Sequence, residues 1–171
     1  TTTPEDDVDD HVATTLLRWL GPSRARIVLD ARRDDVVRAL IHGRAMGPFV
    51  ARELGAVASA WLVEPLLDAL KVVGDAQAHR ERVFWTLENV VEGAPPERRR
   101  DVAAVMDGLQ RCLEPQDAEE EEEEEDFTGA PREAAWPHFA DMNSPARVAF
   151  LRCLSACALA MKRDVKYRLV D

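Results

Sequence analysis

The stretch from Gly47 to Val73 constrains the fold more than any other part of this 171-residue chain. Its apolar residues recur every three or four positions, the spacing that places side chains on one face of an α-helix. Small residues interrupt the pattern near its middle, and we expect two short amphipathic helices joined by a tight turn. The predicted inward residues are Phe49, Val50, Leu54, Val57, Leu62, Leu66, Leu67, Leu70 and Val73.

Helical spacing also precedes this stretch. Thr3-Pro4 is a typical helix start, and Gly21-Pro22 is a typical end. A second helix, capped by Asp34 or Asp35, is predicted to stop at His42-Gly43. Residues 23–32 contain a short apolar run that suits a strand or a buried helical turn, and we take it as helical because no second strand is available to pair with it. The predicted inward residues are Val8, Val12, Leu16, Trp19 and Leu20 in the first helix and Val36, Val37, Leu40 and Ile41 in the second.

Three more helices are predicted after the stretch. They cover residues 76–91, 97–113 and Asn143 to about Arg163, and the segment 131–139 is predicted to return Trp136 and Phe139 to the core. The inward faces are predicted to be Val83, Phe84, Leu87, Val90 and Val91; Val102, Val105, Met106, Leu109 and Leu113; and Val148, Leu151, Leu154, Ala158, Leu159 and Met161.

Parts of this pattern repeat. Val50, Leu54 and Val57 recur 33 residues later as Val83, Leu87 and Val90, and a second set recurs with a shift of 39 residues. A drifting period in the thirties, built from helix pairs, is typical of an α-solenoid.

The segment ARELGAVASAWLVEPLLDAL resembles a HEAT-like repeat of the short bacterial type. It shares the Ala-Arg-x-Leu-Gly first helix, the small-residue turn and the Val-Glu-Pro-Leu-Leu second helix. The resemblance is good over Gly47 to Val73, fair over Ala76 to Leu113 and weak over Asp6 to Met46, and ENVVEGAPPERRRDV lacks both motifs. It implies a curved helical stack that binds or scaffolds proteins, with catalysis as the exception.

We therefore predict an all-α fold, a short α-solenoid of antiparallel helix pairs with about six to eight helices and an acidic inserted loop. The predicted organisation is HEAT-like repeats over residues 1–113, an acidic low-complexity loop over 114–130, and a C-terminal helical cap over 131–171 that packs on the same domain.

The net charge of -10 comes mostly from the loop. Asp117 to Asp126 contains nine acids and no base, and the remainder of the chain has 23 acids against 22 bases. Seven consecutive glutamates, Glu119 to Glu125, repel one another and favour a solvated segment. The segment could be a linker, could fold back on basic patches, or could attract a basic partner.

No motif of catalysis, phosphate binding or metal ligation is present, so we predict no catalytic residue, no cofactor and no metal. Cys112, Cys153 and Cys157 are predicted to be buried free thiols in a reducing compartment. No apolar run of 18 residues and no signal peptide is visible, so we expect no membrane span and a cytoplasmic location.

The favoured function is a non-enzymatic interaction module, scaffold or adaptor that binds a protein on a concave face formed by the second helix of each pair. An inhibitor or immunity-type protein that neutralises a basic toxin or nuclease is the alternative. Nucleic-acid binding through the arginines between Arg24 and Arg44 is less favoured, because Asp30, Asp34 and Asp35 interleave with them, and an enzyme is the least favoured class. The predicted partner-binding residues are Glu64, Asp68, Lys71, Arg98, Asp101 and Asp107.

Overall fold

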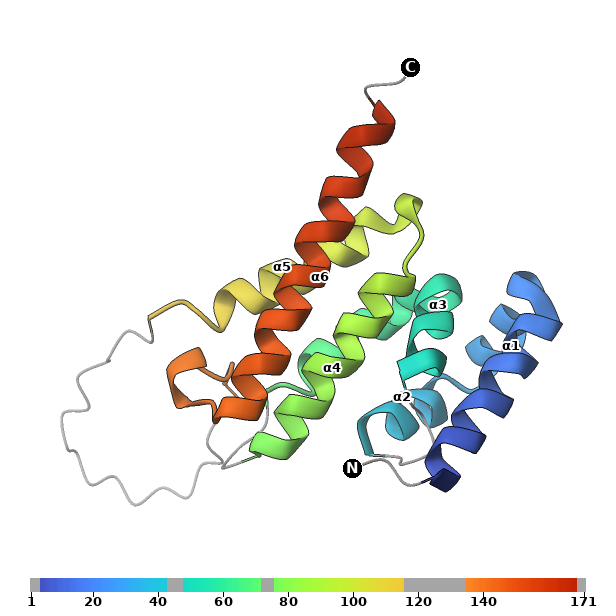
Figure 1. Ribbon diagram of the computed structural model, residues 1–171, viewed down its shortest axis with the longest axis horizontal. Helices are drawn as coiled ribbons and strands as arrows, with labels where there is room; N and C mark the ends of the chain where they lie inside the picture. Colours follow the sequence, from blue (N-terminus) through green and yellow to red (C-terminus); the bar gives the residue numbers. More distant parts are fainter. Residues whose placement is uncertain (1–3, 43–47, 72–75, 116–134, 169–171) are drawn as a thin grey trace.

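The computed structural model describes residues 4–42, 48–71, 76–115 and 135–168, with side chains over 11–42, 50–71, 76–115 and 135–162. These residues form six α-helices and two short 3-10 helices, and they contain no strand, so the all-α prediction is confirmed (Figure 1). The elements are α1 (Pro4–Ala31), α2 (Arg33–His42), α3 (Pro48–Asp68), α4 (Gln77–Gly93), η1 (Pro96–Arg98), α5 (Arg99–Arg111), η2 (Phe139–Asp141) and α6 (Ser144–Arg168).

The stretch Gly47 to Val73 does not form two helices. The structure has one continuous helix, α3, so the predicted turn is wrong. Ala58 and Ser59, which the prediction placed near a turn, are buried inside the helix, and Pro65 lies in its last turn. Alanine and serine are compatible with a helix, and nothing else in the middle of the stretch breaks one. The buried stripe runs unbroken through Val50, Leu54, Ala58, Leu62, Leu66 and Leu70.

Helix α4 is the centre of the fold, with α3 on one side and α6 on the other (Figure 1). It runs antiparallel to α3 and parallel to α6, along which Phe84 meets Phe150 edge to face with ring centroids 5.5 Å apart. All five residues predicted to face inward on this helix are buried: Val83, Phe84, Leu87, Val90 and Val91.

Two glycines allow α3 and α4 to approach closely. A Cβ atom on Gly55 would collide with the backbone of Val90, and one on Gly93 would collide with the backbone of Arg52. Hydrogen in place of a methyl group at these two positions therefore lets the two helices pack backbone against backbone.

Helix α1 bends sharply at Gly21, whose φ of 73° and ψ of 166° lie outside the helical region, and Pro22 follows the bend. The break predicted at Gly21-Pro22 is therefore present, and residues 23–31 are helical as expected. The predicted inward stripe is wrong at Val12, Leu16 and Trp19, which are exposed, whereas Leu20 packs against the core as predicted. The other residues of the face that packs against the core are Ala13, Thr14 and Leu17.

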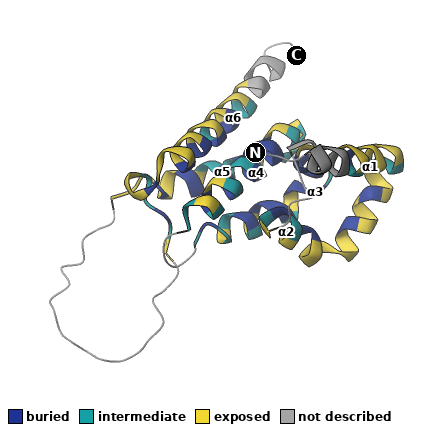
Figure 2. Cartoon of the chain, turned by 60° about the horizontal axis from the view of Figure 1, so that its bottom comes forward, coloured by how far each residue is buried: buried dark blue, intermediate teal, exposed yellow. Residues whose placement is uncertain are grey.

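Helix α6 begins as predicted, with the Asn143 side-chain oxygen accepting a hydrogen bond from the Ala146 amide at 3.0 Å, and its backbone continues to Arg168. Its predicted inward face is wrong at Val148, Leu151, Ala158 and Leu159, which are exposed, whereas Leu154 and Met161 pack against the core. Figure 2 shows exposed residues alternating with buried ones along α6. The residues that face the core are small except for one phenylalanine, and the small side chains let α6 lie close to α4. The buried residues are Ala146, Ala149, Phe150, Cys153, Ala156 and Cys157.

Within the described part of the chain, α6 is the one helix whose length and composition would allow it to cross a membrane. The segment is Ser144–Lys162, with a mean hydropathy of 1.2, whereas we expected no such segment. The core helix of a soluble protein passes the same test, so this observation is weak evidence for a membrane span, and a third of the segment is buried in this fold.

The aromatic residues ahead of α6 return to the core as predicted. Trp136 and Phe139 are half-buried against it, and the Phe139 and Phe150 ring centroids are 5.1 Å apart. The acidic segment Asp117 to Asp126 lies outside the described residues.

The close approach of α3 and α4 predicts that Gly55→Ala and Gly93→Ala each lower the free energy of unfolding by about 2 kcal/mol, since overpacking against backbone exceeds the gain in helix propensity. Urea denaturation measures the change. Gly108→Ala is the matched control, because its Cβ would lie 2.7 Å from the movable Cδ2 of the Leu67 side chain, and we expect a smaller loss there. Wild-type stability in Gly55→Ala would contradict the packing described here.

Candidate functional site

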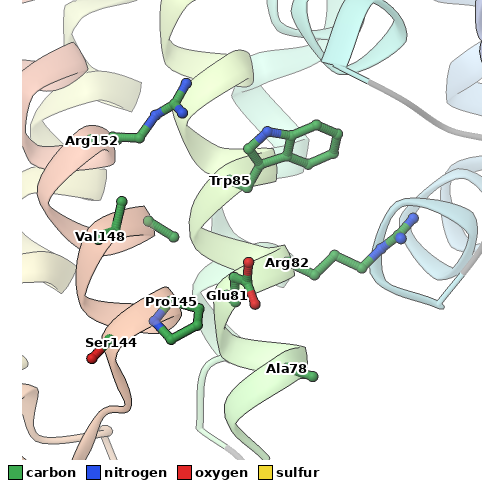
Figure 3. Close-up of a pocket in the computed structure, with 9 residues that line it drawn as sticks. Ala78, Glu81, Arg82, Trp85, Ser144, Pro145, Val148 and Arg152 are labelled. Carbon is green, nitrogen blue, oxygen red and sulfur yellow. The ribbon is translucent and has the colours of Figure 1, made fainter. Parts of the chain in front are cut away.

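A groove runs between α4 and α6 on the outer face of the molecule (Figure 3). Its larger part has a volume of about 720 Å³, and a second hollow of about 360 Å³ beside it shares Val148 and Arg152 with the first. We call these two adjoining hollows together the α4/α6 groove. It is lined by Ala78, Glu81, Arg82, Trp85, Glu88 and Glu92 on α4 and by Ser144, Pro145, Val148, Ala149, Leu151, Arg152, Ser155, Ala156 and Leu159 on α6.

The apolar part of the groove comes mainly from α6. Val148, Leu151 and Leu159 have exposed fractions of 57%, 50% and 57%. They lie three or more positions apart on the side of the helix that faces away from the core, and Pro145 extends the apolar surface to the start of the helix. Three large exposed aliphatics on one side of a helix are a stronger sign of an interaction surface than single exposed residues.

Charged side chains of both signs border this apolar surface. Glu81 on α4 and Arg152 on α6 are both exposed (Figure 3). The Arg152 guanidinium contacts the Glu88 carboxylate of α4 at 3.1 Å. Arg82 points the other way, toward α2, where it donates a hydrogen bond to the Leu40 carbonyl at 3.0 Å. Glu92 pairs with Arg52 at the α3 side. The groove is thus apolar along its length with fixed charges at its borders.

Glu88 is unusual among these residues because its side chain is only 9% exposed. One carboxylate oxygen accepts two hydrogen bonds from Arg152, and the other has no hydrogen-bond partner among the described residues. Burial of a carboxylate is unfavourable without a paired cation. Arg152, although its side chain is 63% exposed, therefore has a structural role in the wall of the groove.

The six partner-binding residues predicted from the sequence lie elsewhere, on α3, α5 and their flanking turns. Asp68 forms an ion pair with Lys71 at 2.8 Å, and Lys71 lies over the Trp136 ring at 4.9 Å. Asp101 accepts a hydrogen bond from the Ser59 hydroxyl at 2.8 Å, which connects α5 to α3. The remaining residues, Glu64, Arg98 and Asp107, are exposed or half-exposed. None of the six lines the α4/α6 groove, and their role in binding stays a prediction.

The arginine-rich segment forms local ion pairs. Asp30 contacts Arg26 at 3.8 Å and Arg33 at 3.3 Å, and Asp35 contacts Arg32 at 2.7 Å and Arg38 at 3.8 Å. The interleaved acids noted in the sequence therefore neutralise neighbouring arginines within one helical turn. This pairing reduces the positive potential available to a phosphate backbone.

The three cysteines are buried, as predicted, and lie in the core where α5 and α6 meet. Burial raises the pKa of the Cys112 thiol to about 12, while the positive charge of Arg80 opposes the shift. The pKa of Cys153 is raised by its hydrogen bond with Cys157 and by burial. Thiols held protonated in this way are poor nucleophiles. The described residues contain no group of three His, Cys, Asp or Glu side chains that could hold a metal ion.

No family model, curated protein or solved structure matches this chain. The resemblance to HEAT-like repeats therefore rests on the sequence pattern, and the groove must be interpreted from its own residues.

The Glu88–Arg152 pair predicts that Arg152→Ala lowers the free energy of unfolding by about 1 to 2 kcal/mol, because it leaves the Glu88 carboxylate buried without its cation. Combining it with Glu88→Gln should recover part of that loss, since the second change removes the charge. Arg32→Ala, which breaks an exposed pair, is the control and should change stability by less than about 0.5 kcal/mol. Additive effects in the double variant would refute the coupling.

The raised thiol pKa values predict a loss of stability in alkali. In the unfolded chain the Cys112 thiol ionises near pH 9, whereas in the folded chain it ionises near pH 12. The contribution is complete below pH 9 and is lost as the pH rises toward 12. Urea midpoints measured across this range should fall less steeply for Cys112→Ala than for the wild type. Parallel pH profiles of the two proteins would show that the thiol is not shifted.

Proposed function

We propose that this chain is a non-enzymatic protein-interaction module whose α4/α6 groove binds an apolar segment of a partner protein. The observation that carries the proposal is the outward row of large aliphatics on α6, formed by Val148, Leu151 and Leu159, beside a groove with charged borders. Such surfaces are typical of interaction sites, where an apolar centre supplies affinity and a charged rim fixes orientation.

An amphipathic helix suits the dimensions of the groove. Pro145 to Leu159 spans four helical turns, or about 20 Å at a rise of 1.5 Å per residue. A partner helix of three to four turns could therefore contact the whole row with residues spaced three or four positions apart. Covering the exposed half of each aliphatic side chain contributes about 1 kcal/mol per residue.

The resemblance to HEAT-like repeats supports the same class of function, since it implies a helical stack that binds proteins. The solenoid arrangement with antiparallel helix pairs is part of this proposal. The inhibitor or immunity-type alternative requires a basic partner, and Glu81, an exposed acid on the α4 side of the groove, is compatible with one. That alternative stays a prediction.

A photo-reactive amino acid at position 151 tests the proposal and identifies the partner. We expect a discrete cross-linked partner from extracts of the source cells, and with that purified partner Leu151→Glu should weaken binding at least tenfold, because a charge replaces the centre of the apolar row. Isothermal titration measures the affinity.

Asp107→Lys is the matched control, since it places an opposite charge on the α5 surface, away from the groove. Unchanged binding by Leu151→Glu combined with loss of binding by Asp107→Lys would move the site to the α3 and α5 residues predicted from the sequence. Failure to detect any partner, at every concentration accessible to titration, would refute the interaction function itself.

A further inference from the structure

Two histidines from different helices lie side by side outside the α4/α6 groove. His42 is the last residue of α2, and His79 lies in the first turn of α4. Their ring centroids are 5.7 Å apart, and the ring planes are inclined by 31°. Because the two residues are far apart in the sequence, no metal-ligand spacing marked them there.

The end of α2 that carries His42 is held on α4. Arg82, about one turn beyond His79, donates a hydrogen bond from its Nε atom to the Leu40 carbonyl at 3.0 Å, and Leu40 is buried. His79 is half-buried, whereas His42 is exposed and forms no hydrogen bond with another described residue. The His42 imidazole can therefore rotate on a backbone that is fixed beside His79.

A backbone carbonyl determines the tautomer of His79. Its Nε2 atom lies 2.7 Å from the carbonyl oxygen of Ala69, just beyond the end of α3. A carbonyl oxygen can only accept, so Nε2 carries the proton, and Nδ1 of the neutral ring keeps its lone pair. Most metal-ligating histidines are oriented by a ring N–H that is donated in this way. His79 thus has the tautomer and the support that a metal ligand needs.

The separation of the rings also fits one shared metal ion. A metal–nitrogen bond of about 2 Å and a tetrahedral angle place the centroids of two bound imidazoles about 5 Å apart. The observed 5.7 Å is close to this value, and rotation of the exposed His42 ring covers the difference. An inclination of 31° is, by contrast, neither the offset-parallel nor the edge-to-face arrangement that aromatic pairs prefer.

We propose that His42 and His79 together bind a divalent transition-metal ion such as Ni²⁺ or Zn²⁺, with water at the remaining positions. Imidazole nitrogen suits these ions, whereas Ca²⁺ and Mg²⁺ prefer oxygen ligands. Two protein ligands are fewer than a structural or catalytic zinc site uses, which agrees with the finding that no group of three potential ligands exists among the described residues. The site therefore holds an exchangeable ion that links α2 to α4.

Isothermal titration of the untagged 171-residue chain with Ni²⁺ tests the proposal. We expect one equivalent to bind and to raise the urea midpoint, because the ion joins two helices only in the folded chain. His42→Phe should weaken this binding at least tenfold, since phenylalanine keeps a ring at the position but supplies no nitrogen. Circular dichroism should show unchanged helix content in this variant, because His42 is exposed. His79→Ala should weaken the binding to a similar extent.

The other two histidines of the chain, His11 and His138, provide the matched control. A variant with both His11→Ala and His138→Ala should bind Ni²⁺ as the wild type does. Ca²⁺ at the same concentration should leave the urea midpoint unchanged, which separates binding by imidazole from binding by carboxylates. Absence of Ni²⁺ binding, binding that persists in His42→Phe, or binding that is lost in the control variant would overturn the proposal.

Discussion

The close contact between α3 and α4 at Gly55 and Gly93 determines how the rest of the chain packs. Because the two backbones touch there, α4 presents one full side to α3 and leaves its other side for α6. A helix enclosed in this way must satisfy its own polar side chains. Thr86 donates to the Arg82 carbonyl at 2.8 Å and Asn89 to the Trp85 carbonyl at 2.9 Å, each one turn earlier in the same helix. The Glu88 carboxylate takes its partner from α6.

Helix positions followed from the sequence more reliably than helix orientations. The five inward residues of α4 were predicted correctly because neighbours pack on that helix from two sides and bury all its large aliphatic residues. In α1 and α6 the prediction assigned the largest aliphatics to the core, whereas small residues such as Ala13 and Ala149 face it. Periodicity identifies a face of like residues, but the distance between helix axes decides which face fits the neighbour.

The same physical argument explains why the groove was not predicted. Helix α6 carries two apolar faces, a small one with Ala146 and Cys153 that packs on its neighbours and a large one with Leu151 that lines the groove. A helix that is apolar on more sides than its own fold can cover needs a further partner, and this excess is also why its mean hydropathy reaches 1.2. The sequence contains that signal, but reading it required knowing which face α4 covers.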